Sequence, residues 1–371
     1  MRDIVIIGGG LAGLVNAVML SRAGLDVLLI EKKDYPHHKV CGEYVSNEVL
    51  PFLKSHGLFP EERGPAAISR FMLTSVSGGS SLMPLDLGAF GISRYAFDDF
   101  LYHKAQEAGT DFLLNTAVRE VEFKDDHFLL SLPHNKALQA RLVIGAYGKR
   151  SRLDKQLDRP FARERSPYIG VKYHLRTDFP DDLIALHNFR GGYCGISRVE
   201  DGRTNLCYLG SRSSLRQYGS IEEMEQAVVY ENPYLRDIFM QAEFLFEKPE
   251  VINEVSFAPK QPVENHILMS GDTAGLITPL CGNGMAMAIH SAKLLSELII
   301  QYYRPEGFRR SVLEEAYRQQ WQQAFAQRLW VGRKVQRLFG SAWLSEAGVG
   351  MVRNIRPLAR WIMRNTHGRY I

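Results

Sequence analysis

The chain has 371 residues, of which 45% are hydrophobic and 23% charged, and its formal net charge is +4. This composition is typical of a folded globular protein, and the length predicts about two domains. The four cysteines show no CxxC or CxxH spacing, so the sequence predicts neither a disulfide framework nor a metal site. The first strand begins directly after Asp3, and no apolar run reaches the ~18 residues that span a bilayer, so we expect a cytoplasmic protein.

The first 31 residues have the pattern of a nucleotide-binding βαβ unit. An apolar strand ends at Ile7, a turn with Gly8, Gly10 and Gly13 follows, and an apolar helix leads into a second strand that ends at Ile30. Gly8 permits the tight bend, Gly10 lets the backbone approach a pyrophosphate, and Gly13 lets the helix pack against the strand. The diphosphate would lie on free N–H groups at the helix N-terminus.

Glu31 closes the second strand, 18 residues after Gly13. An acid about 20 residues after the glycines binds ribose hydroxyls in such units. A carboxylate at this place repels a 2′-phosphate, so NADP is excluded from this site. The turn and the acid together do not distinguish NAD from FAD.

The middle of the chain predicts a second kind of structure. Residues 167–257 alternate apolar and polar side chains between turn signals, which is typical of an antiparallel sheet. The flanking patterns predict a helix at 48–57, strands at 68–73 and 80–85, a helix at 95–108, a hairpin that turns at 125–126, strands at 142–145 and 267–272, and a helix at 284–303.

We therefore expect an α/β protein with a discontinuous, doubly wound, Rossmann-like nucleotide domain. That domain comprises residues 1–75, 93–160 and 258–305, and an antiparallel-sheet substrate domain comprises residues 76–92 and 161–257. Residues 306–371 form a C-terminal helical segment, with a helix from 313 to 338 in which Gly332 marks the place for a break.

The C-terminal segment is strongly basic. From Ala316 to Ile371 it holds ten Lys or Arg residues against one acid, Glu346, together with all four tryptophans. Arginine with tryptophan suits a membrane interface or an acidic carrier protein, and the alternative is a helical segment with a solvated basic face. A nucleic-acid partner is not predicted.

Three further features favour a flavin. Asp272 follows Gly271 at the end of an apolar strand, where it can bind sugar-alcohol hydroxyls, and the glycine-rich turn after it directs N–H groups at an anionic ring edge. Arg94 begins a helix from which it can reach a phosphate. Gly148 ends the segment after another strand, where the backbone can approach a ligand closely.

With these motifs the chain resembles the flavoproteins that have the fold of p-hydroxybenzoate hydroxylase, over most of residues 1–300. The resemblance implies FAD as the cofactor, with contacts from Gly8, Gly10, Gly13, Glu31, Arg94 and Asp272. The complete set of predicted FAD-binding residues is Gly8, Gly10, Leu11, Ala12, Gly13, Glu31, Lys32, Cys41, Arg94, Val118, Gly148, Gly271, Asp272, Pro279, Gly282, Gly284 and Met285.

The chain departs from that family at one position. The usual Gly-Ala-Asp-Gly is Gly145-Ala146-Tyr147-Gly148 here, and in the family the aspartate serves cofactor and nicotinamide binding. No second GxGxxG is present either. We expect electrons to come from NADH or NADPH that binds transiently, or from another protein.

Lys39-Val-Cys41-Gly42-Glu43 is similar to the geranylgeranyl reductase branch, whose members carry a Cys-Gly pair beside the flavin. Where those reductases have Tyr-x-Trp-x-Phe-Pro, this chain retains only the tyrosine, Tyr193. The resemblance makes Cys41, Gly42 and Tyr193 the catalytic candidates. The Trp-x-Trp-x-Ile-Pro signature of flavin halogenases is absent.

Several of these residues also have a purely structural interpretation. Cys41 could gate the site or donate a proton, or it could simply fill a tight turn. Glu43 could steer protons, although loop carboxylates are usually solvated, and His174 is expected to pack in the sheet. We expect reduction or dehydrogenation of a C–C bond in a lipophilic or carrier-bound molecule, with NAD(P)H-dependent monooxygenation as the alternative. Halogenation and a non-catalytic electron-transfer role are less favoured.

Overall fold

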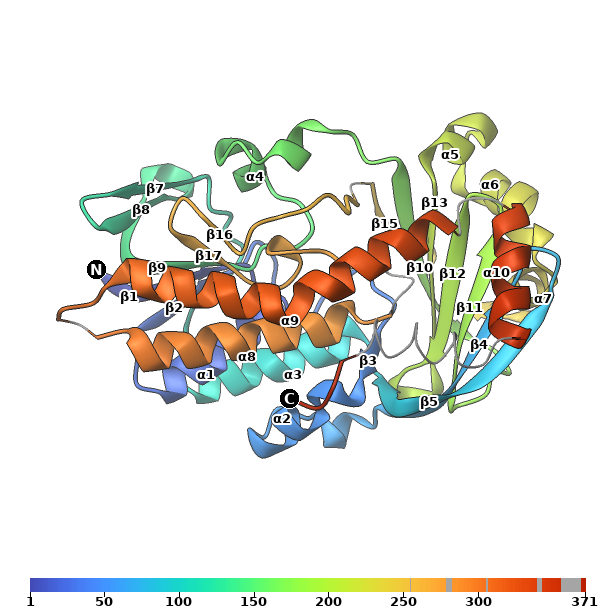
Figure 1. The fold of residues 1–371 in the computed structure, drawn as a ribbon, viewed down its shortest axis with the longest axis horizontal. Helices are drawn as coiled ribbons and strands as arrows, with labels where there is room; N and C mark the ends of the chain where they lie inside the picture. Colours follow the sequence, from blue (N-terminus) through green and yellow to red (C-terminus); the bar gives the residue numbers. More distant parts are fainter. Residues whose placement is uncertain (254, 278–281, 305, 339–341, 355–367) are drawn as a thin grey trace.

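The computed structural model describes residues 1–253, 255–277, 282–304, 306–338, 342–354 and 368–371, and two sheets occupy the two halves of the molecule (Figure 1). The strands of the first sheet are β1 (Arg2–Ile7), β2 (Val27–Ile30), β6 (Asp111–Leu113), β7 (Glu120–Lys124), β8 (His127–Ser131), β9 (Ala137–Gly145), β16 (Val263–Glu264) and β17 (Ile267–Met269). The order along the sheet is β16-β17-β9-β1-β2-β6, and all neighbours from β17 to β6 pair in parallel.

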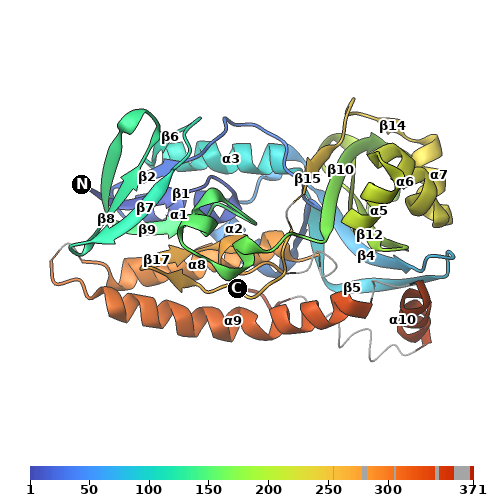
Figure 2. The same cartoon turned by 90° about the horizontal axis from the view of Figure 1, so that it is seen from above.

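Long helices pack beside this parallel sheet. They are α1 (Leu11–Arg22), α3 (Arg94–Glu107), α8 (Gly284–Tyr302) and α9 (Arg310–Leu338). α1 contacts both α3 and α8, and α9 runs along the outside of α8 (Figure 2). The helices and strands share one core, which explains why β2 is buried along its whole length and is continuously apolar rather than alternating.

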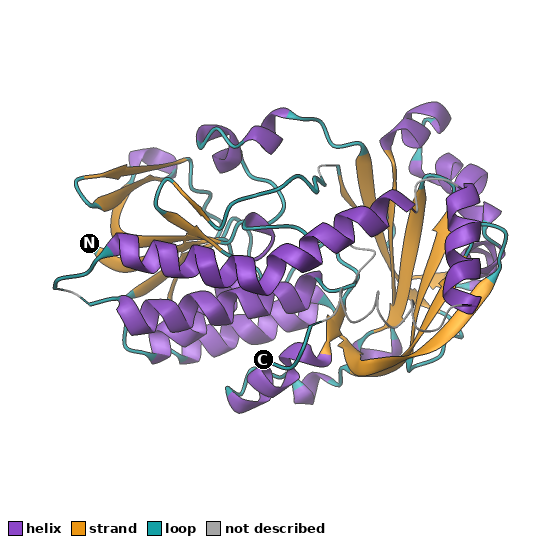
Figure 3. Ribbon diagram, in the orientation of Figure 1, coloured by secondary structure: helices purple, strands orange, loops and turns teal. Residues whose placement is uncertain are grey.

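The second sheet is mostly antiparallel and stands at the other end of the molecule (Figure 3). Its order is β14-β10-β13-β12-β11-β4-β5-β3, with β15 paired to β10. Only the β4–β11 pair is parallel among the strand pairs described for it. The strands are β3 (Tyr44–Ser46), β4 (Ala66–Thr74), β5 (Ser80–Gly91), β10 (Tyr168–Arg176), β11 (Leu183–Phe189), β12 (Gly192–Arg198), β13 (Thr204–Ser211), β14 (Glu243–Phe244) and β15 (Glu250–Ile252).

Shorter helices surround the two sheets. α5 (Arg212–Tyr218), α6 (Ile221–Val228) and α7 (Pro233–Gln241) lie at the second sheet, α10 (Ala342–Asn354) lies beside β5, and α2 (Leu50–Ser55) and α4 (Arg152–Gln156) belong to connecting segments. Met224 of α6 and Phe239 of α7 pack with Val171 and Leu206 of the sheet. α5, α6 and α7 therefore cover one face of the second sheet, whereas the other face is turned to the loops of the first sheet and contacts Val349 of α10.

The structure confirms the predicted α/β fold and most predicted elements, with two corrections. Gly332 does not break its helix, because α9 continues to Leu338. The predicted helix at 48–57 is a short 3₁₀ turn at Asn47–Val49 followed by α2. The division into domains stays a prediction, but β3 and β4 lie in the second sheet although residues 1–75 were assigned to the nucleotide domain.

A buried carboxyl group lies on the helix-covered face of the second sheet. Glu225 of α6 accepts hydrogen bonds from the Tyr173 hydroxyl at 3.0 Å and the Tyr208 hydroxyl at 2.7 Å. Burial raises the pKa of Glu225 to about 7, although the two donors oppose the change. A carboxyl whose pKa is raised in the folded state stabilises the fold when it is protonated, and this stability is lost as the pH rises through its folded pKa.

We expect Glu225→Gln to reduce the loss of stability between pH 5 and pH 8. The amide cannot ionise, so the variant should gain on the order of 2 kcal/mol over the wild type at the upper end of this range. Chemical unfolding at several pH values measures the difference. Glu223→Gln, on an exposed position of the same helix, is the control and should follow the wild-type curve; identical slopes for wild type and Glu225→Gln would contradict the prediction.

Candidate cofactor and active site

The loops that follow four parallel strands lie at one edge of the first sheet. β1 ends before Gly8, β2 before Glu31, β9 before Ala146, and β17 before Ser270, Gly271 and Asp272. Parallel strands place their carboxyl ends at the same edge, and ligands of open α/β sheets bind there. The segments that the sequence singled out for a dinucleotide are therefore neighbours.

The glycine turn is shaped by close contacts. A Cβ atom at Gly8 would lie 2.5 Å from the Ala146 carbonyl oxygen, and one at Gly13 would lie 2.0 Å from the Gly8 carbonyl oxygen. At Gly10 the nearest atom to such a Cβ is Nη2 of Arg94, at 3.4 Å. Gly10 is also the N-cap of α1 and provides no side-chain cap. The first N–H groups of the helix and a guanidinium thus face one space, which fits a diphosphate.

Glu31 is fixed at the end of β2. It is buried, and its Oε2 accepts the Gly9 N–H at 2.6 Å while its Oε1 accepts the Lys33 N–H at 3.2 Å. The hydroxyl of Tyr35 donates to the Gly9 carbonyl at 2.6 Å. The Glu31 carboxylate is therefore oriented against the glycine turn, as binding of a ribose requires. Lys32, which was also predicted to bind the cofactor, is exposed to solvent.

Two cations share one buried carboxylate beside the turn. Nε and Nη2 of Arg94 each bind Asp98 at 2.7 Å, and Nζ of Lys39 binds Asp98 at 2.7 Å and the Gly9 carbonyl at 3.2 Å. Burial would raise the pKa of Asp98, but the charges of Arg94 and Lys39 outweigh burial and lower it. The net positive charge favours a bound diphosphate, and Asp98 orients the guanidinium that would bind it.

Hydrogen bonds join the loops after β9 and β17. The Gly148 N–H donates to Oγ1 of Thr273 at 2.9 Å, and Nζ of Lys260 donates to the carbonyls of Lys149 at 2.9 Å and Asp272 at 2.8 Å. Burial lowers the pKa of Lys260 to about 8. These bonds fix the backbone on both sides of the site. No motif in the sequence singles out Lys260.

The remaining predicted cofactor residues have different surroundings. Gly271 has φ +66°, and a Cβ there would lie 2.9 Å from the Ala12 Cβ, so this glycine lets the loop pack on α1. The Tyr147 hydroxyl lies 3.6 Å from Sδ of Met269, which turns the side chain toward β17. Leu11, Val118 and Met285 are buried in the core, Gly282 and Gly284 flank the start of α8, and Pro279 lies outside the described residues.

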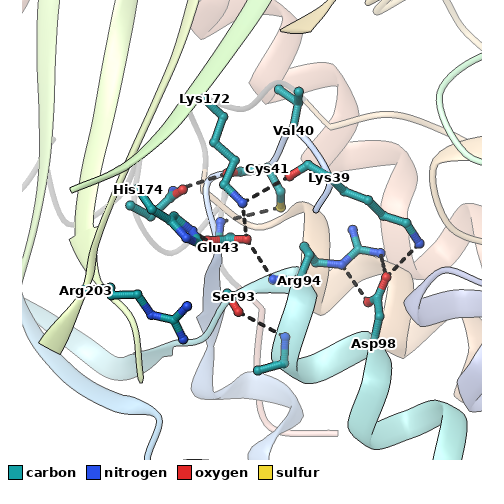
Figure 4. A network of polar contacts seen from close by, with 12 residues as sticks. Lys39, Val40, Cys41, Glu43, Ser93, Arg94, Asp98, Lys172, His174 and Arg203 are labelled. Atoms are coloured by element: carbon teal, nitrogen blue, oxygen red, sulfur yellow. Dashed lines mark hydrogen bonds and ion pairs between the residues drawn. The ribbon is translucent and has the colours of Figure 1, made fainter. Parts of the chain in front are cut away.

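Cys41 lies in the turn that leads to β3 (Figure 4), and Gly42 is the next residue of this turn. The Cys41 carbonyl accepts a hydrogen bond from Nδ2 of Asn205 on β13 at 3.2 Å, and a Cβ at Gly42 would meet no atom within 4 Å. Glu43 follows with φ +52° and is completely buried. The expectation of a solvated loop carboxylate at this position is wrong.

Glu43 binds two side chains of β10. Nζ of Lys172 lies 2.5 Å from its Oε1, and Nε2 of His174 lies 2.6 Å from its Oε2 (Figure 4). Burial alone would raise the pKa of Glu43, but Lys172 and His174 lower it to about 2. His174 therefore does more than pack in the sheet. We call Glu43, Lys172 and His174 the Glu43 network.

An apolar area adjoins these polar groups on the same face of the second sheet. We call it the apolar inner patch; four side chains of the sheet, Leu73, Leu186, Tyr193 and Leu209, pack there with Val255 and Leu276 of loops and Val349 of α10. Leu209 pairs with Tyr193 across β13 and β12, so both side chains point to one face. Leu276 comes from the loop after β17 and therefore connects the patch to the cofactor edge. Tyr193 lies in this patch, whereas Cys41 contacts the polar part of the same face.

Comparison with known proteins identifies the family of this arrangement. The model of the family described as "FAD binding domain" matches residues 1–329. The chain belongs to this family. FAD is its cofactor, and the protein is an FAD-dependent oxidoreductase. The glycine turn, the oriented Glu31 and the Arg94 guanidinium agree with that cofactor, which supplies hydride or oxygen chemistry when bound.

Relatives and solved structures agree with the fold. Digeranylgeranylglycerophospholipid reductase 2 of Methanopyrus kandleri is 26% identical over 91% of this chain and 86% of its own length. Menaquinone reductase of Mycobacterium tuberculosis is 25% identical over 80% of this chain and 76% of its own length. The structure of the flavin-dependent brominase Bmp2 superposes with a TM-score of 0.79 at 18% identity, covering 100% of this chain and 94% of that one. A geranylgeranyl bacteriochlorophyll reductase-like protein of Thermoplasma acidophilum gives 0.77 at 17% identity, with 98% and 96% covered.

In the described part of the chain, no group of three or more His, Cys, Asp or Glu side chains is placed to hold a metal ion. No helix among those same residues combines the length and the apolar character needed to cross a bilayer.

We expect Gly10→Ala to weaken FAD binding without unfolding the protein. The new methyl group would occupy the space in front of Arg94, while the backbone at Gly10, with φ −90°, suits any residue. The dissociation constant for FAD, titrated by flavin fluorescence, should rise about tenfold or more, because the diphosphate needs close backbone approach. Gly348→Ala, whose Cβ meets no atom within 4 Å, is the control. Unchanged FAD affinity in Gly10→Ala would place the diphosphate elsewhere.

Proposed function

We propose that this enzyme reduces C–C double bonds of a lipophilic molecule that binds at the apolar inner patch. The main support for this proposal is the apolar inner patch. In it, buried leucines and Tyr193 of the sheet contact Leu276 of the loop that follows β17. A ligand there would lie between the sheet and the predicted flavin position. Two relatives, digeranylgeranylglycerophospholipid reductase 2 and menaquinone reductase, are named as reductases of lipophilic molecules and support the proposal.

The roles of the chain's own residues follow from their positions. The glycine turn, Glu31 and Arg94 would hold the cofactor, the apolar inner patch would bind and orient the substrate and exclude water, and Cys41 would lie at the border between the two. Tyr147 stands where the related flavoproteins carry an aspartate for nicotinamide, and its side chain turns toward Met269. We therefore infer that the electron donor is a transiently bound NADH or NADPH, or another protein.

The test of the reaction uses two probes, a phospholipid with geranylgeranyl chains and menaquinone. FAD-loaded enzyme is reduced with dithionite without oxygen and mixed with each probe in detergent. We expect at least one probe to gain pairs of hydrogen atoms in its isoprenoid chain, detected by mass spectrometry of the chain after any quinol has been reoxidised in air, and the flavin to become oxidised. A product that forms only in air with NADH or NADPH and contains an atom of labelled dioxygen would show a monooxygenase and overturn the proposal.

Leu209→Asn tests the location of the substrate. The substitution keeps the size of the side chain but places an amide in the apolar inner patch, so KM for the reactive probe should rise about tenfold. FAD affinity should remain unchanged. Leu82→Asn, at an exposed position on β5, is the control and should leave KM unaltered. Equal KM values for both variants would place the substrate elsewhere.

We also propose that the C-terminal segment binds the enzyme to an anionic membrane surface, from which a lipophilic substrate is available. Trp330 of α9 is 55% exposed, and Nζ of Lys334 lies 5.5 Å from its ring centre. An exposed tryptophan beside basic residues is typical of interfacial helices. Trp321 is buried instead, and Trp361, Arg356, Arg360 and Arg364 lie outside the described residues.

Vesicle sedimentation tests the membrane proposal. The full chain should bind vesicles that contain phosphatidylglycerol more strongly than pure phosphatidylcholine vesicles, since each basic residue near an anionic surface contributes about 1 kcal/mol. Salt should weaken the binding. Trp330→Gln should reduce it several-fold, whereas Tyr234→Gln, at a partly exposed aromatic position on α7, should not. Binding that is equal for both vesicle types would contradict the proposal.

A further inference from the structure

The Glu43 network joins three parts of the chain that are distant in sequence. Oε1 of Glu43 accepts the N–H of Arg94, the first residue of α3, at 2.7 Å, in addition to Nζ of Lys172. The Glu43 carbonyl accepts the Ile92 N–H at 3.1 Å. One carboxylate thus connects the Cys41–Gly42 turn, the helix that carries the predicted diphosphate ligand, and β10 of the second sheet.

Side chains of the second sheet and of the loop after β9 bind the backbone carbonyls of the turn. The carbonyl of Lys39 accepts a hydrogen bond from Nζ of Lys172 at 3.3 Å, and that of Val40 accepts one from Nζ of Lys149 at 3.2 Å. The Cys41 carbonyl is bound by Asn205, as described above. Three successive carbonyls are therefore fixed by side chains from elsewhere, whereas Gly42 remains exposed.

Stability alone does not account for this arrangement. Glu43 and Lys172 are completely buried and His174 is almost so. Replacing a buried ion pair by apolar residues of similar volume is often neutral or stabilising, because the charges lose their hydration. Apolar packing lacks directional bonds, however, and would not fix the Lys39 carbonyl and the N–H at the start of α3 in one geometry, as Lys172 and Glu43 do.

We propose that Glu43, Lys172 and His174 are positioning residues, which hold the Cys41–Gly42 turn against the bound flavin and in register with Arg94. The glycine turn, Glu31 and the Arg94 guanidinium, which Asp98 orients, would hold the cofactor, so loss of the network would leave FAD bound but release the turn. The inference rests on the FAD cofactor and not on the proposed substrate. Failure of the reduction assay would therefore leave it intact.

The experiment compares Glu43→Gln, Lys172→Met and the double variant with the wild type, all as full-length, FAD-loaded protein. Each single change deprives one buried charged group of its partner in the Lys172–Glu43 ion pair and should lower the melting temperature, whereas the double change removes both charges and should largely restore it. Tyr173→Phe is the matched control, because Tyr173 lies between Lys172 and His174 on β10 but bonds to Glu225 on the opposite face.

Two measurements report the position of the turn. The first is the rate at which iodoacetamide alkylates Cys41, followed by peptide mass spectrometry with the buried Cys194 as internal reference. The second is the absorbance and circular dichroism of the bound flavin. In the double variant we expect alkylation to be about tenfold faster, since a released turn opens more often, and the flavin spectrum to change. Tyr173→Phe should alter neither.

Three outcomes would overturn the proposal. Wild-type alkylation and spectra in the double variant would show a purely structural ion pair. Equal changes in Tyr173→Phe would show a general loosening of β10. Loss of FAD binding in a double variant of restored stability would show that the network binds the cofactor rather than positions the turn.

Discussion

Parallel pairing of β17, β9, β1 and β2 is the constraint on which the rest of the structure depends. It brings together four loops that are separated by more than 200 residues in the chain, from Gly8 to Asp272. Other contacts at the site only adjust how closely these loops pack. Gly13 and Gly271 allow close packing on the loop and on α1, and Lys260 and Thr273 bind the loops to one another.

The sequence predicted the parts of the site that depend on short-range geometry. Glycines spaced by two and three residues after an apolar strand specify a turn whose shape depends only on nearby backbone, and Glu31 follows at a set distance because the helix between the strands has a set length. The hairpin at residues 125–126 is a similar case, since Asp125 and Asp126 both adopt positive φ. Local rules were sufficient for these features.

Long-range partners could not be predicted in this way. Glu43 and Lys172 are 129 positions apart, and only the pairing of β10 in the second sheet brings them together. The same holds for Lys260, which binds a carbonyl 111 positions away. Lys172 and His174 alternate on a strand, a signal that predicts one shared face but not the buried carboxylate opposite. Likewise, Gly332 weakens a helix by local propensity, yet α9 continues because Trp321, Phe325 and Leu329 pack in the core.

The inner face of the second sheet has a polar part, which holds the Cys41–Gly42 turn, and an apolar part, the apolar inner patch. Strand register determines where each part lies. Lys172 pairs with Cys207, Cys207 with Gly195, and Gly195 with Leu186, so this row runs from the Glu43 network to the apolar inner patch. Gly195 leaves the middle of the row without a side chain. Polar groups that hold the turn therefore lie on β10 and β13, while the apolar side chains lie mainly on β12, β11 and β4. A ligand on the patch would meet the Cys41–Gly42 turn only at the border of these two areas, and this border is where the reacting atoms of flavin and substrate are expected to meet.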